Sequence, residues 1–330
     1  MRSFQYYKAA TAAQVISLLK RHGQEAAILA GGSDILSMMK DRIEGPKFPS
    51  SQHLIDIKGI KALNSIKEQG SGLKIGATTT LNDISSSPIV STRYPVLASA
   101  ARQVAVPQIR NVGTLGGNLC QRPRCWYFRG RLFKDCLRKG GGDCYAQGGE
   151  NQYHAIFGAD VCAMVCPSDM ASALTALNAK VEIATPKGKR LVPVEQFFMR
   201  PERTVLKETT LGPSEMVLAV EIPGPEEGFR GTYMKLKERQ AFDFATASVA
   251  VGLTLRQGEL VSNSRIILGG VASFPFRAAS AEAALKGKKV QEAIGAASRA
   301  AVEGARPLSN NGYKVKAARG LIEQALASLV

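Results

Sequence analysis

Apolar residues recur along the first half of the chain in patterns typical of alternating helices and strands. Between residues 12 and 19, Ala12, Val15, Ile16 and Leu19 lie three or four positions apart, which predicts an amphipathic helix. Short apolar runs predict strands at 26–29, 54–57 and 73–77. Further helices are predicted at 35–39, at 94–104 and at 171–177. A short helix is also predicted directly after Thr80, whose hydroxyl can cap it.

The second half of the chain changes from a hairpin pattern to strands and then to helices. Residues 180–184 and 189–192 predict a hairpin around the turn sequence 186–188, Pro-Lys-Gly. Strands are predicted at 247–255 and 264–268, and amphipathic helices near 290–303 and 312–328. The segment 223–228, Pro-Gly-Pro-Glu-Glu-Gly, is the best linker candidate. The pattern therefore predicts an α+β protein without an internal repeat.

The composition is ordinary for a soluble globular protein. Of the 330 residues, 45% are hydrophobic and 21% charged, and this length is typical of two or three domains. The sequence contains no apolar run of about 18 residues that predicts a membrane span. The first residues lack the apolar core of a signal peptide. We therefore expect a cytoplasmic protein, or a periplasmic one that is exported together with a partner subunit.

The net charge of +16 raises the question of nucleic-acid binding. However, the basic residues are spread along the whole chain rather than gathered in one arm. There is one Trp, and aromatic residues do not alternate with basic ones as in RNA-binding motifs. We expect no nucleic-acid partner, and interpret the charge as a solvated basic surface or a surface for an acidic partner subunit.

Two glycine-rich loops are candidates for phosphate binding. The predicted strand at 26–29 is followed by Gly31-Gly32-Ser33-Asp34 and then a helix, and a second loop spans 113–118. Glycines allow backbone N–H groups to approach a phosphate, and a helix N-terminus favours negative charge. A lone Gly-Gly-Ser between a strand and a helix is more often a plain turn than a phosphate-binding loop. Two such loops together are compatible with the two phosphates of a dinucleotide. The sequence contains neither a G-x-G-x-x-G motif nor a Walker A loop.

All six cysteines fall between residues 120 and 166, which indicates a metal or iron–sulfur site. Their spacing matches neither a zinc ribbon nor a bacterial ferredoxin, although any four of them are enough for a cluster or a zinc ion. Seven Arg or Lys residues in 121–144 would stabilise a negatively charged cluster. Disulfides and free buried thiols are the alternatives. The three histidines, His22, His53 and His154, share no metal-ligand spacing and receive no catalytic role, and no hydrolytic triad is evident.

Several ordered motifs together resemble the FAD-binding (medium) subunit of the molybdenum hydroxylases, the family of xanthine dehydrogenase, aldehyde oxidoreductase and carbon monoxide dehydrogenase flavoproteins. The insert around 121–128, Gln-Arg-Pro-Arg-Cys-Trp-Tyr-Phe, resembles the subgroup that carries an extra [4Fe-4S] cluster, such as the periplasmic aldehyde oxidoreductase. The motifs lie at 30–36, 108–118, 167–169, Lys235 with Arg239, 242–245, 269–272 and 313–315.

This resemblance implies a vanillyl-alcohol-oxidase (PCMH-type) FAD-binding fold followed by a C-terminal α+β domain like that of the carbon monoxide dehydrogenase flavoprotein. The FAD-binding domain would span 1–222, with subdomains of about 1–57 and 58–222 and a [4Fe-4S] insert at about 120–162. The C-terminal domain would span 229–330.

The resemblance also implies the site residues. Cys125, Cys136 and Cys144 would ligate the cluster with Cys162 as the fourth ligand, Cys120 being the alternative and Cys166 incidental. Lys235 would lie at the flavin or at a partner surface, as would Arg239, although a solvated position fits both equally. The residues expected at FAD are Ala30, Gly31, Gly32, Ser33, Asp34, Ile35, Leu36, Gly113, Thr114, Gly116, Gly117, Asn118, Leu119, Ser168, Asp169 and Lys235.

The implied function is electron transfer within a larger oxidoreductase. A large subunit with the molybdenum cofactor would oxidise the substrate, a small [2Fe-2S] subunit would relay the electrons, and FAD on this chain would pass them to an external acceptor. The three subunits would form a heterotrimer or its dimer. Two other hypotheses remain open: a zinc-stapled basic nucleic-acid-binding protein, and a stand-alone flavin oxidase of the same fold.

Overall fold

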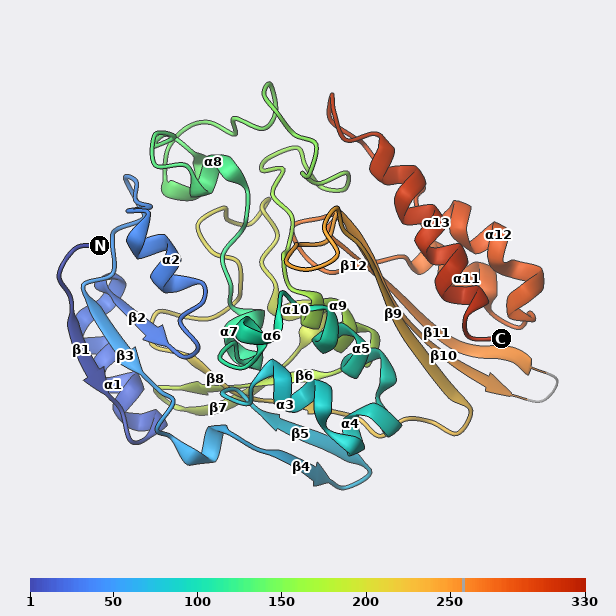
Figure 1. Ribbon diagram of the computed structural model, residues 1–330, viewed down its shortest axis with the longest axis horizontal. Helices are drawn as coiled ribbons and strands as arrows, with labels where there is room; N and C mark the ends of the chain where they lie inside the picture. Colours follow the sequence, from blue (N-terminus) through green and yellow to red (C-terminus); the bar gives the residue numbers. More distant parts are fainter. Residues whose placement is uncertain (257–258) are drawn as a thin grey trace.

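The computed structural model describes residues 1–256 and 259–330, which form three β-sheets with helices between and around them (Figure 1). The first sheet is parallel, in the order β1 (Gln5–Lys8), β3 (His53–Asp56) and β2 (Ala26–Leu29). Parallel neighbours need crossover connections, and α1 (Ala12–His22) with the short η1 (Gly23–Glu25) provides the first. Five residues separate β2 from α2 (Ile35–Lys40), which lies in the connection between β2 and β3.

The second sheet has five antiparallel strands in the order β4-β5-β8-β6-β7. The hairpin predicted around 186–188 joins β6 to β7. The segment between β5 and β6 contains several short helices and the cysteine-bearing insert. The strands are β4 (Ile66–Gln69), β5 (Gly72–Gly76), β6 (Lys180–Thr185), β7 (Gly188–Pro193) and β8 (Met216–Ile222), and the shorter helices around them are η2 (Lys61–Leu63), α3 (Leu81–Ser86), α4 (Pro88–Arg93), α6 (Pro107–Arg110), α7 (Leu115–Leu119) and α10 (Val194–Phe197).

The third sheet follows the predicted linker and is covered on both faces by helices. Its order is β12 (Phe276–Arg277), β11 (Leu260–Gly269), β10 (Ala247–Arg256) and β9 (Phe229–Leu236), all antiparallel. Along β10, Val249 and Val251 pack in one core and Ala250 in another, as side-chain alternation in a strand requires. One core contains α11 (Ala279–Leu285), α12 (Val290–Ala300) and α13 (Tyr313–Ala327), and the other contains α5 (Pro95–Gln103) and α9 (Asp169–Ala176).

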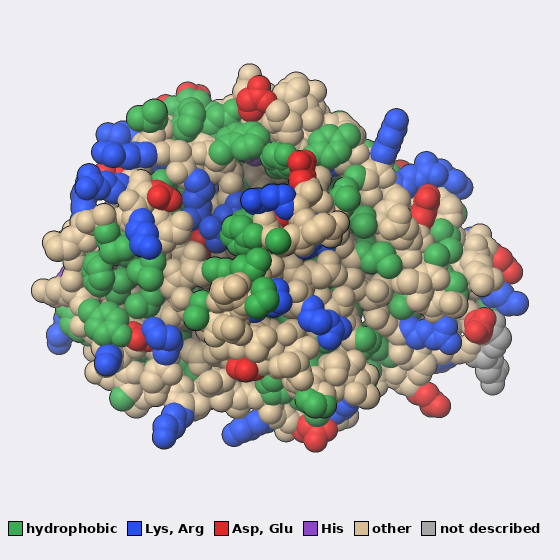
Figure 2. Space-filling model, viewed as in Figure 1, with side chains coloured by type: hydrophobic (Ala, Val, Ile, Leu, Met, Phe, Trp, Pro, Cys, Tyr) green, Lys and Arg blue, Asp and Glu red, His purple; other side chains and the backbone are tan. Residues whose placement is uncertain are grey.

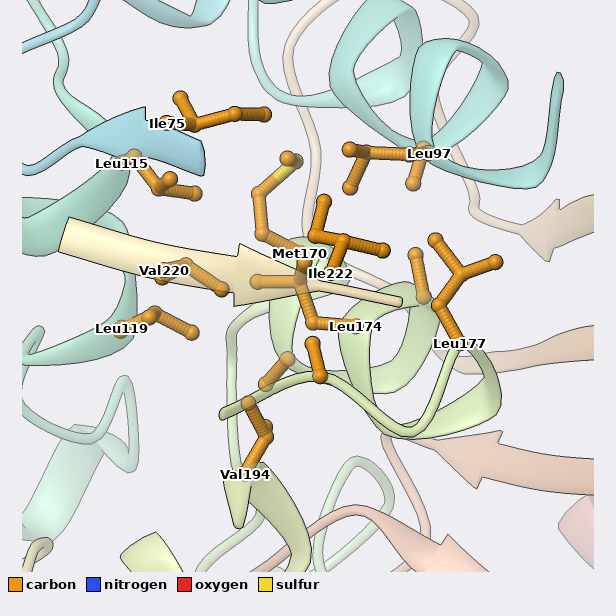
Figure 3. Close-up of a cluster of buried hydrophobic side chains, with 14 of the residues drawn as sticks. Ile75, Leu97, Leu115, Leu119, Met170, Leu174, Leu177, Val194, Val220 and Ile222 are labelled. Carbon is orange, nitrogen blue, oxygen red and sulfur yellow. The ribbon is translucent and has the colours of Figure 1, made fainter. Parts of the chain in front are cut away.

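The largest core lies between the second and third sheets (Figure 3). Ile75 and Val220 from the five-stranded sheet meet Met170 and Leu174 from α9, and all four side chains are fully buried. Leu115 and Leu119 from α7 enter the same core. Helix α7 and the start of α9 are therefore fixed by apolar packing, which positions the polar residues beside them.

Residues 120–168 form an irregular insert between α7 and α9, with only α8 (Trp126–Arg129) and η3 (Leu137–Lys139) as regular elements. In Figure 1 the insert covers one edge of the molecule, beside α2 and the start of α13. None of the helices in the described ranges is both long and apolar enough to cross a lipid bilayer.

The predicted helices and strands are all present, with ends that differ by a few residues. Helix α9, for example, begins at Asp169 rather than at residue 171, because Ser168 caps it by accepting from the backbone N–H of Ala171. Thr80 caps α3 in the predicted way. The strands β8 and β9, on either side of the linker, are not predicted by the residue pattern.

Candidate functional site

The two glycine-rich loops contact each other although they are about 80 residues apart in the sequence. A Cβ atom on Gly31 would lie 2.0 Å from the carbonyl oxygen of Val112, so no side chain fits there without moving one loop. Gly32 has φ of +73°, a conformation that favours glycine. Figure 2 shows a hollow in this face of the molecule, below the insert, with Lys and Arg side chains along its edge.

Each loop leads into the N-terminus of a short helix. Thr114 caps α7 by accepting a hydrogen bond from the backbone N–H of Gly117 at 3.2 Å, and Gly117 is exposed. Backbone N–H groups at a helix start are suited to phosphate oxygens. Ile35 and Leu36 pack beside a small core at the start of α2, and Leu119 is buried in the large core (Figure 3). These apolar side chains hold the loops in place by packing. Contacts with a ligand would therefore come from backbone atoms of the loops rather than from these side chains.

A chain of buried polar residues connects α7, α9 and β9. Ser168 donates to the side-chain carbonyl of Asn118 at 2.6 Å, which joins the second loop to α9. Asp169 accepts from Lys235 Nζ at 2.7 Å and from the Tyr233 hydroxyl at 2.5 Å. Burial, and then the charge of Asp169, raise the pKa of Tyr233 well above its ordinary value. The predicted residues Asn118, Ser168, Asp169 and Lys235 are thus brought together, whereas the Arg239 side chain is exposed.

Asp34, which closes the first loop, is held by arginines of the insert. Arg129 Nη2 lies 2.5 Å and Arg124 Nη2 2.8 Å from its Oδ1, and the backbone N–H of Arg122 donates to Oδ2 at 2.8 Å. Arg122 also pairs with Glu208 at 2.7 Å. The insert is therefore attached directly to the loop that precedes α2.

Four of the six cysteines line one cavity inside the insert: Cys125, Cys136, Cys144 and Cys162. Its free volume is about 10 Å³, roughly the room of one water molecule. The other two cysteines, Cys120 and Cys166, pack against the large core instead. Within residues 1–256 and 259–330, no three His, Cys, Asp or Glu side chains converge as a site for a single metal ion.

Three of the four cavity thiols are held against ionisation, and Cys162 is the exception. Burial raises the pKa of Cys136, and nearby backbone amides of the segments that begin α8 and η3 offset the effect of burial on Cys125 and Cys136 in part. A hydrogen bond from Cys144, with the charge of Arg138 beside it, lowers the pKa of Cys162. The same hydrogen bond, followed by burial, raises the pKa of Cys144, and burial raises that of Cys125 to about 12.

Two polar residues contact cysteines at this cavity: Arg138, one of the seven basic residues that the sequence places near a cluster, and His154, which the sequence pattern does not place here. His154 Nε2 lies 3.2 Å from Cys125 Sγ, and Arg138 Nε donates to Cys162 Sγ at 3.3 Å. Arg138 is balanced by Glu208, whose Oε1 lies 2.7 Å from Nη1. His154 is separated from Cys125 by 29 positions and belongs to no recognisable ligand motif.

Two family models account for nearly the whole chain. The FAD binding domain in molybdopterin dehydrogenase matches residues 2–225, and the CO dehydrogenase flavoprotein C-terminal domain matches residues 232–329. The aldehyde oxidoreductase FAD-binding subunit PaoB of Escherichia coli (strain K12) is 34% identical over 99% of this chain and 98% of its own length. The carbon monoxide dehydrogenase medium chain of Hydrogenophaga pseudoflava is 33% identical over 98% of this chain and 96% of its own.

Solved structures agree with these matches. A structure of carbon monoxide dehydrogenase from Hydrogenophaga pseudoflava, which lacks the Mo-pyranopterin moiety of its cofactor, superimposes with a TM-score of 0.77 at 33% identity, covering 99% of this chain and 97% of that one. The predicted α+β fold, an FAD-binding domain followed by a carbon monoxide dehydrogenase flavoprotein C-terminal domain, is therefore confirmed. The chain belongs to the family of FAD-binding subunits of the molybdenum hydroxylases, and is an oxidoreductase subunit.

Proposed function

We propose that this chain is the FAD- and [4Fe-4S]-carrying electron-transfer subunit of a molybdenum-containing hydroxylase that oxidises aldehydes or N-heterocycles such as xanthine. Its large partner would carry the molybdenum cofactor and its small partner a [2Fe-2S] cluster, in a heterotrimer or its dimer. The single observation that supports both prosthetic groups is the attachment of the cysteine-lined cavity to the glycine loop through Asp34.

The residues at the glycine loops fit FAD. Gly31 and Gly32 keep the first loop free of side-chain bulk, and the start of α2 offers backbone N–H groups for the pyrophosphate. The first N–H groups of α7 donate to Thr79, Ala77 and Thr114 instead, so the second loop contributes its shape and its contact with the first loop. Asn118, Ser168, Asp169 and Lys235 form the buried polar network at which we place the rest of the cofactor. Lys235 balances the charge of Asp169, so neither buried charge is left without a partner. FAD, when bound, exchanges electrons one or two at a time.

The donor set at the cavity fits a [4Fe-4S] cluster. Such clusters are held by four cysteine thiolates, and four thiols line this one cavity. A single zinc ion would draw four ligands to about 2.0–2.3 Å, and among the described residues no three His, Cys, Asp or Glu side chains converge in that way. Admitting a cluster requires the four side chains to turn outward, because the free volume is about 10 Å³. Arg138 and the backbone amides would then balance the charge of the thiolates.

The remaining features of the proposal concern organisation and compartment. We place the FAD-binding domain at 1–222, with subdomains of about 1–57 and 58–222 and the insert at about 120–162, and the C-terminal domain at 229–330. We place the protein in the cytoplasm, or in the periplasm after co-export with a partner. The acceptor is external to the chain.

Replacing Gly31 by alanine is expected to weaken FAD binding by about 10- to 100-fold, because accommodating a methyl group in a tightly packed contact costs about 1–3 kcal/mol. The new Cβ would collide with the Val112 carbonyl and force the two loops apart. Titration of FAD-free protein with FAD, followed by flavin fluorescence, measures the change. Gly59→Ala is the matched control, since nothing lies within 4 Å of a Cβ there. Equal affinities for the two variants would refute the role of the loop.

The decisive experiment is a UV–visible spectrum of anaerobically purified protein, with iron and zinc quantified on the same sample. The proposal predicts flavin bands, a broad iron–sulfur shoulder and about four irons per chain. Flavin without iron would remove the cluster and leave the FAD subunit. Zinc without flavin would favour the stapled nucleic-acid-binding alternative, to be tested by the salt dependence of DNA binding. Substrate oxidation by the isolated chain would favour a stand-alone flavin oxidase.

A further inference from the structure

Two buried nitrogen atoms are directed at two of the four cavity cysteines. His154 Nε2 lies 3.2 Å from Cys125 Sγ, and Arg138 Nε lies 3.3 Å from Cys162 Sγ. Both side chains are almost fully buried, with 3% of His154 and 1% of Arg138 exposed. A polar group buried to this extent is normally hydrogen-bonded, and for His154 Nε2 the sulfur is the partner.

The surroundings of His154 determine which ring nitrogen carries the proton. Nδ1 is buried and has no partner, whereas Nε2 faces the sulfur. A thiolate that ligates iron has lone pairs but no proton, so it can only accept a hydrogen bond. The tautomer with hydrogen on Nε2 is therefore the one that satisfies the contact, and a neutral imidazole is sufficient to form it.

The C-terminal domain holds His154 in place through its backbone. Lys314 Nζ donates to the His154 carbonyl at 2.9 Å, and Asn311 Nδ2 donates to it at 3.2 Å. Trp126 packs edge-on against the imidazole at a centroid distance of 5.4 Å, and Tyr127 lies 6.0 Å away. Both the backbone and the ring of His154 are thus held by neighbours in the insert and in the C-terminal domain, so the direction of Nε2 is built into the fold.

We propose that His154 and Arg138 donate hydrogen bonds to the cluster ligands Cys125 and Cys162 and thereby raise the reduction potential of the cluster. This inference rests on the proposed function. Reduction adds one negative charge to the cluster and its thiolates, and a hydrogen-bond donor stabilises the more negative state more strongly. His154 does so without a net charge, and Arg138 does so as a guanidinium whose partner Glu208 is shared with Arg122.

The test uses the complex purified anaerobically with its partner subunits, with iron content and an EPR-monitored redox titration for each variant. His154→Phe keeps an aromatic ring against Trp126 and removes the donor. We expect the reduction equilibrium to shift about tenfold toward the oxidised cluster, which is about 59 mV for a one-electron couple. His154→Gln, which keeps an N–H donor, should recover part of the shift. Tyr145→Phe is the control, because Tyr145 lines the cavity and its hydroxyl bonds to none of the cysteines.

The outcomes separate this inference from the function on which it rests. No iron in the unsubstituted complex would refute the cluster itself. Full iron in all variants, with the potential of His154→Phe unchanged, would refute the role of His154 and leave the proposed function intact. If His154→Phe fails to retain iron, His154→Met provides the same comparison with a flexible side chain. Electron–nuclear double resonance on the unsubstituted protein with ¹⁵N-histidine should show a coupled ring nitrogen with an exchangeable proton, and its absence would also overturn the proposal.

Discussion

Replacing Cys162 by alanine is expected to remove the iron–sulfur cluster, whereas Cys120→Ala is expected to retain it. Cys162 lines the cavity with Cys125, Cys136 and Cys144, and Cys120 packs against the large core instead. Three thiolates leave one iron of a [4Fe-4S] cluster without a protein ligand. The cluster content of Cys162→Ala should therefore fall from about four irons per chain to a small fraction of that value.

The two cysteine variants form a matched pair, because each removes one thiol from the same stretch of chain. Iron content, and the EPR signal of the reduced protein, should distinguish them directly. Circular dichroism serves as the control for folding, because Cys120 is the C-cap of α7 and directly follows the second glycine loop. Iron lost from Cys120→Ala but retained in Cys162→Ala would make Cys120 the fourth ligand. Iron retained in both would exclude both cysteines.

The glycine loops illustrate what the sequence predicts and where such prediction ends. Gly31-Gly32 after a strand and the loop at 113–118 are each recognisable from residue type and local pattern alone. Their direct contact, through Gly31 and the Val112 carbonyl, depends on how two subdomains pack. Local patterns report backbone conformation within a few residues, whereas this contact joins positions about 80 residues apart. The pattern alone makes the two loops compatible with one dinucleotide, and the resemblance to a known family assigns both of them to FAD.

The insert shows the same limit more strongly. The cluster of cysteines and the basic residues of 121–144, Arg138 among them, are visible in the sequence. The contact of His154 with Cys125 is not, and neither is the choice of Arg138 as the partner of Cys162, because neither pair has a ligand-like spacing. The strand β8 is missed for another reason. Its sequence, Met216–Ile222, is apolar at nearly every position since the strand is buried on both faces, and a short continuous apolar run does not distinguish a strand from a helix.

Replacing Lys314 by methionine is expected to lower the free energy of unfolding by about 3 kcal/mol and to loosen the insert. The ammonium group is fully buried and donates to the carbonyls of Tyr153, His154 and Gly270 at 3.1, 2.9 and 2.5 Å. Each buried acceptor left without a donor costs about 1–3 kcal/mol, partly offset because methionine is cheaper to bury than lysine. Two of the three carbonyls belong to the insert, so its hydrogen exchange around residues 153 and 154 should accelerate.

Lys314 also gives the stability of the protein a pH dependence whose sign can be worked out. Burial lowers the pKa of Lys314 in the folded state to about 7, from 10.5 in an exposed lysine. Between these values the unfolded chain binds more protons than the folded one, so stability rises with pH from about 7 toward 10.5 and falls again as pH decreases through 7. Urea unfolding at pH 7, 8 and 9 should show this rise, by as much as a few kcal/mol, in the unsubstituted protein and lose it in Lys314→Met.

The matched control is Lys316→Met, which removes an exposed lysine from the same helix, α13. It should keep both the stability and the pH dependence of the unsubstituted chain. If Lys314→Met kept the same slope with pH, the charge of Lys314 would not be linked to folding, whatever the loss at pH 7. If it lost the slope but exchanged no faster around residue 154, the lysine would stabilise the C-terminal domain alone. If Lys314→Met exchanged faster around residue 154 and also lost iron, α13 would be required to hold the cluster-binding insert in place.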